Sequence, residues 1–239
     1  RVELYLTLMF FLLLVAVAGW VGAKAILSFV FSVLLIWKAL IPLCLAGYDP
    51  IIVSLGIVAT LTGVITLLVG GVSRKGVTAF LGGFLGLLTT CALAMLFAPE
   101  FHLIGTTRPF AKSLLFTNPQ LDVYRFFIAG VFIACSGAVM DLAMDIAAAM
   151  QEIKQHHPAI TGRQLFTAGL KVGQAVVGTM TTTLLLAHSG GYMMMLAHFM
   201  SQEIPLAVMM NSTFFSSEML NTMVGSFGLV TVAPFSALV

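Results

Sequence analysis

The chain is a succession of long apolar runs separated by short polar breaks. A helix needs about 20 consecutive apolar residues to cross the hydrocarbon core of a bilayer, and most of these runs reach that length. The pattern therefore predicts an all-α fold, a polytopic transmembrane helix bundle that forms one domain over residues 1–239. The clearest predicted spans cover residues 4–21, 25–46, 51–72, 77–98, 123–154 and 219–239.

The apolar pattern is least regular between the fifth predicted span and the last one. "HSGGY" at 188–192 predicts a turn or a kink, and "SQEIP" at 201–205 interrupts the next apolar run, with Pro205 suited to the first turn of a new helix. We expect a sixth span that ends near the first of these breaks and a kinked span over 190–211. This arrangement gives eight crossings; a broken helix in place of the kinked span gives seven.

The segments before and after the fifth predicted span, 99–122 and 155–174, are more polar than the other connections. Residues 99–122 contain three prolines and form the longest predicted loop outside the membrane. The run 123–154 is long enough to project beyond the bilayer. After it, Thr161 is a candidate cap, and residues 163–174 are amphipathic, so we expect them to lie along the interface before the chain enters the membrane at Ala175.

Composition supports the membrane class and excludes several others. Apolar residues make up 60% of the chain and charged residues 8%, with a mean hydropathy of +1.08, whereas a soluble domain carries about 25% charged residues. A net charge of +2 is too small to indicate nucleic acid. The three cysteines lie inside apolar runs at spacings that fit no zinc pattern, so we expect neither a metal site nor a cofactor.

Lysine and arginine positions give a weak orientation signal. The short loop "SRKG" at 73–76 predicts that its side faces the cytoplasm and that the amino terminus lies outside. Because the chain begins with Arg1 and not with Met, we also expect the full-length protein to extend upstream. The cytoplasmic side collects Lys24, Arg74, Lys75, Lys154 and Arg163, and the opposite side collects Arg1, Arg108, Lys112 and Arg125.

Two acidic residues stand inside the most apolar part of the fifth span. Asp141 and Asp145 are four residues apart in "GAVMDLAMDIAAAM", so they share one helix face. A carboxylate deep in a bilayer costs about 2.5–3.5 kcal/mol on insertion scales, so it is paired, hydrated or protonated. Two such groups side by side suit proton or cation exchange. The alternative is structural: they pair with Lys171 or Lys38, or reach the cytoplasmic edge.

Further candidates for a polar pathway come from the last third of the chain. In "GTMTTTLLLAH" Thr179 and Thr182 share a face, either as a hydroxyl lining or simply bonded back to their own helix. Glu218 is expected in the first turn of the last span, capped by Ser216 or Ser217, and Glu203 precedes a new helix. Both glutamates have this ordinary helix-start explanation, but a broken helix would make Glu203 part of a binding site.

Four stretches of the chain form a specific pattern when taken together: "IPLCLAGYDPIIVSL", "SGAVMDLAMDIAAAMQEI", "GRQLFTAGLKVGQAVVGTMTTTLLLAH" and "VGSFGLVTVAPFSAL". This pattern resembles the YibE/F family of bacterial multi-pass membrane proteins, and the likeness runs over nearly the whole chain. The aspartate of the family pattern corresponds to Asp141. This chain departs from the pattern at Asp145, where a small hydroxyl residue is usual, at Gln174 and Ala175, where an Arg-Asp pair is usual, and at Thr182, where asparagine is usual.

The resemblance implies a permease-type membrane protein of the bacterial inner membrane. Our main hypothesis is a transporter in which Asp141 and Asp145, with the Thr179 and Thr182 face, line a cation or proton path. The alternative is a membrane scaffold or accessory factor for export or envelope assembly. No catalytic set supports an enzyme. The expected partners are the lipid bilayer and protons or cations, with association of copies left open.

Overall fold

The computed structural model describes residues 2–71, 73–101, 107 and 110–239, and every regular element in these ranges is helical. The predicted all-α fold is therefore confirmed. Arg1 and Arg108 of the orientation argument lie outside the described residues. The elements are α1 (Val2–Leu35), η1 (Ile36–Leu40), α2 (Ile41–Leu45), α3 (Pro50–Gly70), α4 (Arg74–Phe97), α5 (Ala111–Thr117), α6 (Val123–His156), α7 (Gly162–Ser201), α8 (Leu206–Met210) and α9 (Thr213–Leu238).

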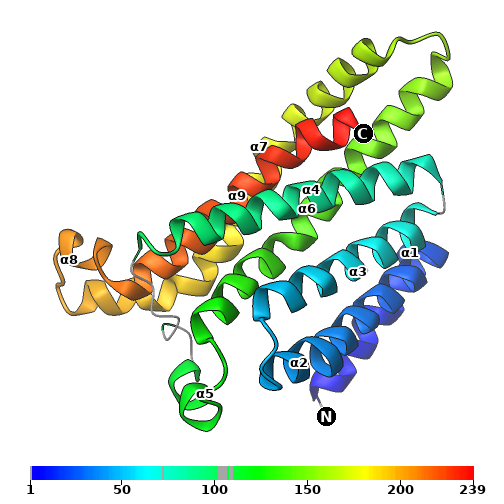
Figure 1. Cartoon of the computed structure of the whole chain (residues 1–239). Helices are drawn as coiled ribbons and strands as arrows, with labels where there is room; N and C mark the ends of the chain where they lie inside the picture. Colours follow the sequence, from blue (N-terminus) through cyan, green and yellow to red (C-terminus); the bar gives the residue numbers. More distant parts are fainter. Residues whose placement is uncertain (1, 72, 102–106, 108–109) are drawn as a thin grey trace.

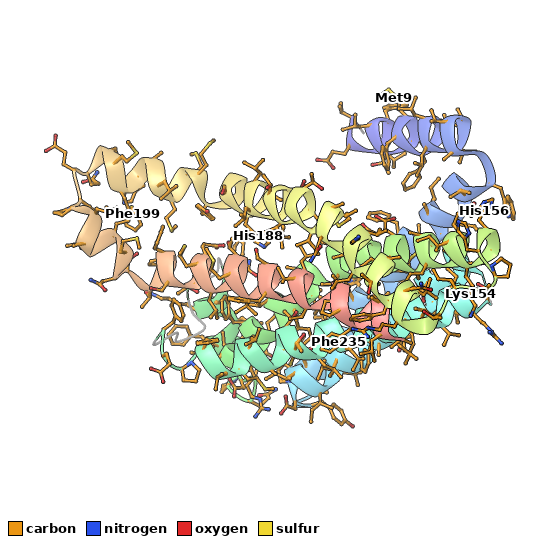
Figure 2. The ribbon with its side chains drawn as sticks, turned by 90° about the horizontal axis from the view of Figure 1, so that it is seen from above. Met9, Lys154, His156, His188, Phe199 and Phe235 are labelled. Atoms are coloured by element: carbon orange, nitrogen blue, oxygen red, sulfur yellow. The ribbon has the colours of Figure 1, made fainter. Side chains whose placement is uncertain are left out.

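The first helical stretch is a hairpin of two apolar arms. Gly19 has φ 55° and ψ −129°, a backbone conformation outside the helical region that favours glycine. The ring of Phe11 lies 6.3 Å from that of Phe29, although 18 residues of straight helix would separate them by about 27 Å. Figure 2 shows the arm that carries Met9 standing away from the rest of the bundle. The first two predicted spans therefore exist, with the turn at Gly19.

The second arm continues through a π-helical turn into α2. Pro42 has no N–H, and its ring would clash with the carbonyl of residue 38 in a regular α-helix. The turn Ile36–Leu40 is widened, so that the Ile41 N–H donates to the Ile36 carbonyl. The chain thus accommodates Pro42 through a π-turn. Asp49 then caps α3 by accepting a hydrogen bond from the Ile51 N–H at 2.9 Å.

The expected break at "HSGGY" is absent, because α7 runs without interruption from Gly162 to Ser201. Ser189 donates its hydroxyl to the Leu185 carbonyl, and Gly190 and Gly191 remain helical. The expectations of an interfacial segment over 163–174 and of two further spans before the last helix were therefore wrong. The interruption predicted at "SQEIP" is present at 202–205, and Pro205 directly precedes α8, which contains only five residues.

The described residues contain six helical stretches long and apolar enough to cross a membrane. The first, Val2–Leu45, contains both arms of the hairpin, so the apolar arms number seven in the part of the chain that the structure describes. This agrees with the smaller of the two expected counts. An odd number of crossings places the described amino-terminal residues and the carboxyl terminus at opposite ends of the bundle.

The centre of the bundle consists of α4, α6 and α9. Figure 1 shows these helices side by side, with α7 along α6 and α9, and with α3 and then α1 on the other flank. Small residues allow the close approach: methyl groups added to Gly82 and Gly86 of α4 would collide with Ser236 and Val232 of α9. Thr89 and Thr231 add a hydrogen bond of 2.9 Å between the same helices.

We call the end of the bundle that carries the α3–α4 turn, the α6–α7 turn and the carboxyl terminus the basic end. Thr161 caps α7 there through a reciprocal pair of bonds with Gln164, as expected. Arg125 pairs with Asp49 at 2.7 Å near the opposite end. The predicted sorting of cations is retained for the described residues at the basic end, which are Lys24, Arg74, Lys75, Lys154 and Arg163.

Candidate functional site

Asp141 lies near the middle of the bundle along its long axis. A methyl group placed on Gly83 of α4 would lie 3.4 Å from the Cβ of Ala143 in α6, so these two residues lie at the same height along the bundle. Gly83 is nine residues, or about 14 Å, beyond Arg74 at the basic end of α4. A hydrocarbon core about 30 Å thick that began at Arg74 would place Asp141 about halfway through it.

The two aspartates share the outer face of α6. Both side chains are exposed in the chain, whereas Leu142 and Ile146 beside them are fully buried in the core. The ion pairs of the described residues lie elsewhere, between Arg125 and Asp49 and between His156 and Glu152. Pairing of the aspartates with Lys171 or Lys38, which was one alternative, is not made within the described part of the chain.

Lys38 and Lys171 are themselves exposed. The Lys38 ammonium lies 4.6 Å above the centre of the Trp37 ring, a cation–π contact within the π-turn. The sequence could not place Lys38 on a face, because its neighbouring residues are apolar all round. Neither side chain is brought to the aspartates, which therefore keep an outward face without a basic partner among the described residues.

Small residues continue this face of α6 toward the end of the bundle opposite the basic end. We call that end, which carries Asp49, Asp122 and Glu203, the acidic end. Gly130, Ala134 and Gly137 are exposed and fall in register with Asp141 at helical spacing. Methyl groups added to Gly130 or Gly137 would meet no atom within 4 Å. This surface runs from Gly130 to Asp145, which is its residue nearest the basic end, and is called the α6 face below.

A pocket of about 380 Å³ opens on the part of the α6 face that lies nearest the acidic end. Gly130 and Ala134 form part of its wall, and α5 contributes Ala111 and Leu114. Asn221 of α9 also lines it and is 6% exposed; its Oδ1 has no hydrogen-bond partner among the described residues. The sequence argument missed Asn221. The signal available was an amide near the start of the last predicted span, and polar groups within spans usually face protein.

The threonines of α7 lie at the depth of Asp141. Gly173 of α7 packs against Ile146, so Asp141, five residues earlier on an antiparallel helix, is level with Gly178. Thr179 donates its hydroxyl to the Val176 carbonyl at 2.9 Å. Its neighbour Thr182 bonds in the same way to Gly178, also at 2.9 Å.

These bonds are the structural alternative that the sequence left open, since each hydroxyl proton is used within its own helix. Both threonines nevertheless are exposed, and each oxygen keeps a lone pair that can accept a further hydrogen bond. Thr179 and Thr182 are thus available as acceptors at the depth of the aspartates, but not as free donors.

The two glutamates are not brought to this site. Glu203 is exposed in the turn after α7, where it adopts a φ of 53°, at the end of the bundle away from the aspartates. Glu218 lies in the second turn of α9, because that helix begins at Thr213 and is capped by Ser212. The expected cap at Ser216 or Ser217 was therefore wrong; Ser217 is buried and donates to the Phe214 carbonyl.

Comparison with known proteins gives the family and nothing finer. No curated protein and no solved structure matches the chain. The profile of one family, described as YibE/F-like protein, matches residues 6–239 and so spans all seven apolar arms. With its helices long and apolar enough to cross a bilayer, this chain is a multi-pass membrane protein that belongs to the YibE/F-like family.

Proposed function

We propose that this protein is a permease of the bacterial inner membrane that moves protons or small cations along the α6 face. Asp141 is the central group of the proposed path, with Asp145 one turn nearer the basic end. Thr179 and Thr182 supply acceptor oxygens from α7 at the same depth. The proposal is for transport and not for a chemical reaction.

The observation that carries the proposal is a pair of exposed carboxylates near the middle of the long apolar helix α6, without a basic partner in the described chain. Such groups are costly in hydrocarbon when charged, so they stay where water, a proton or a cation can reach them. The outer pocket on the α6 face supports an approach from the acidic end of the bundle, since Ala134 in its wall is only seven residues, or about 10 Å, from Asp141.

The second candidate is the scaffold or accessory factor. It expects the aspartates to be paired inside a dry bundle, as structural charges are. Their exposure on the α6 face favours the permease over that arrangement. In a scaffold, the same face would instead be occupied permanently by another protein, and no solute would pass.

The test is flux through proteoliposomes that carry an imposed proton or alkali-cation gradient. Wild-type protein should dissipate at least one of these gradients, and Asp141→Asn should reduce the flux to the level of protein-free liposomes. Asp122→Asn is the matched control: it makes the same chemical change at the cap of α6, where asparagine also serves as a cap. Wild-type vesicles as tight as empty ones, or unchanged flux in Asp141→Asn, would remove the proposal.

A further inference from the structure

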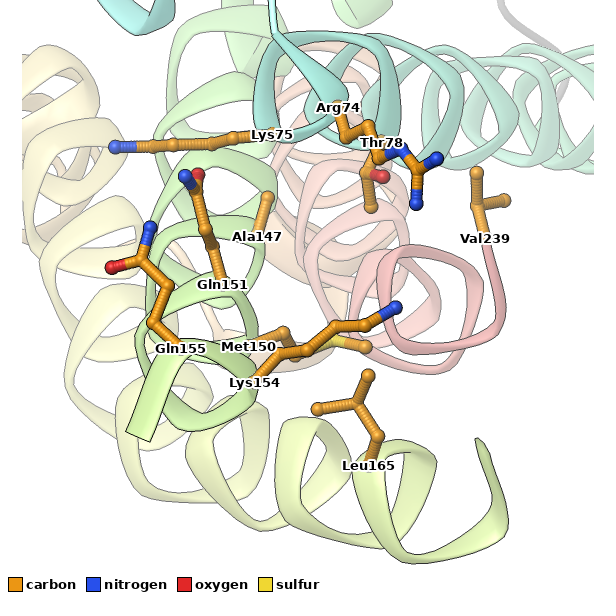
Figure 3. A pocket seen from close by; sticks show the side chains of 10 residues that line it. All are labelled: Arg74, Lys75, Thr78, Ala147, Met150, Gln151, Lys154, Gln155, Leu165 and Val239. Atoms are coloured by element: carbon orange, nitrogen blue, oxygen red, sulfur yellow. The ribbon is translucent and has the colours of Figure 1, made fainter. Parts of the chain in front are cut away.

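A second pocket, of about 450 Å³, lies at the basic end of the bundle, away from the α6 face. It is formed where the start of α4 meets the last turns of α6 and the first turns of α7, and Val239 closes one side (Figure 3). Its charged lining consists of Arg74, Lys75 and Lys154. The proposed transport path uses none of these residues.

Among the described residues, no aspartate or glutamate side chain pairs with the three cations of this pocket. Glu152 is the acidic residue of α6 nearest to them in sequence, and it bonds to His156 at 2.9 Å and does not line the pocket. Figure 3 shows the side chains of Arg74 and Lys154 reaching toward the same side of the pocket from different helices, near Val239, while Lys75 extends the opposite way. An anion bound on this side of the pocket would interact favourably with both of these cations.

The backbone of α4 adds to this positive field. The helix begins at Arg74, and Ser73 caps it by accepting a hydrogen bond from the Gly76 N–H. The first N–H groups of a helix have no acceptor within it, and its dipole favours a negative charge at this end. Thr78, one turn further, and Gln151 of α6 contribute neutral polar groups to the lining.

We propose that this pocket binds a phosphate group. Arginine can donate two parallel N–H hydrogen bonds to phosphate oxygens, and lysine adds a point charge. Arg74 and Lys154 could therefore bind one phosphate group from two sides. The pocket lies at the membrane boundary, because Val77, only three residues into α4 from Arg74, is an exposed apolar side chain. The phosphate is that of an anionic phospholipid headgroup or a free phosphate ion, which share the same chemistry.

Positive residues at a cytoplasmic end also serve as topology signals, and this simpler explanation makes a different prediction. A topology signal depends on total charge at that end and not on which side chains line a cavity. Lys24→Gln is therefore the matched control, because Lys24 lies at the same end but outside the pocket. Its loss should leave phosphate binding unchanged, whereas the double variant Arg74→Gln/Lys154→Gln should weaken binding about 100-fold.

The experiment measures both sources of phosphate on the purified full chain. Native mass spectrometry after reconstitution with phosphatidylcholine, with or without phosphatidylglycerol and cardiolipin, reports retained lipid. Thermal unfolding with sodium phosphate or with sodium chloride at equal ionic strength reports the free ion. Anionic lipid kept by wild type and by Lys24→Gln but lost from the double variant identifies the headgroup. Phosphate-specific stabilisation with the same dependence on residues identifies the free ion.

The proposal is overturned if wild type neither retains anionic lipid preferentially nor is stabilised by phosphate over chloride. It is also overturned if Lys24→Gln loses binding as strongly as the double variant. The wild-type comparison of phosphate with chloride and of anionic with zwitterionic lipid decides the matter even where the double variant fails to fold. Neither readout involves transport, so its result is independent of the proposed permease activity.

Discussion

Replacement of Gly82 by alanine should separate α4 from α9. A Cβ at this position would lie 2.6 Å from the Cα of Ser236 and 2.8 Å from its Cβ, whereas carbon atoms in contact are normally about 3.5–4.0 Å apart. The two backbones must therefore part by about 1 Å. Overpacking of this kind costs about 1–3 kcal/mol, and alanine in a helix returns up to about 1 kcal/mol relative to glycine. Because the overlap is with the Cα and Cβ of Ser236 and not with the flexible end of a side chain, we take the cost as about 2–3 kcal/mol, which leaves an expected net loss of about 1–2 kcal/mol after the helical gain.

Thermal unfolding of the purified protein in detergent measures this loss. For a chain of this length, 1–2 kcal/mol corresponds to a decrease of about 5 °C in Tm. Gly56→Ala is the matched control, since Gly56 lies within α3 and an added methyl group would meet no atom within 4 Å. That variant should unfold at the wild-type temperature or slightly above. Equal Tm values for the two variants would refute the close packing of α4 on α9.

Two further changes test the acidic end of the bundle and the number of crossings. Asp49→Ala should lower the free energy of unfolding by about 1 kcal/mol more than Asp49→Asn does. Asparagine retains the cap of α3, whereas both variants lose the half-exposed ion pair with Arg125. Equal losses of the two variants in thermal unfolding would show that the cap contributes nothing. We expect Lys75→Cys and Val239→Cys, each in a chain without the native cysteines, to react with an impermeant thiol reagent from the same side of the membrane. Tyr48→Cys in the same background should react from the other side. Labelling of positions 75 and 239 from opposite sides would favour eight crossings.

The first four predicted spans could be derived from the sequence because hydropathy responds to composition and not to packing. Each contains a run of about 20 apolar residues bounded by a turn signal. The same rule fails at 188–192, where Gly190 and Gly191 remain in α7. In water a glycine pair commonly breaks a helix, but in hydrocarbon a broken helix exposes backbone groups that nothing satisfies. The helix therefore continues until Ser201, after which Gln202, Glu203 and Pro205 end it.

The candidate site was predictable in its residues but not in its surroundings. Helical spacing alone puts Asp141 and Asp145 on one face. Which way that face points depends on the neighbours of α6, and helices that are apolar all round do not mark their inner side. The deciding contacts come from Gly83 and Gly173, whose missing side chains let α4 and α7 approach the far side of α6. No single-sequence rule gives the partner of such a glycine.

The most direct test of the central claim is the accessibility of the α6 face at mid-membrane depth. A nitroxide label at Gly137→Cys lies one turn from Asp141 with both aspartates intact, and a label at Leu88→Cys lies at the same depth on α4, where the side chain is 37% exposed. In lipid nanodiscs, the account predicts that a water-soluble nickel complex relaxes the label at 137 more strongly than the label at 88, which oxygen should relax instead. Equal accessibility of both labels to oxygen, with none to nickel, would contradict it.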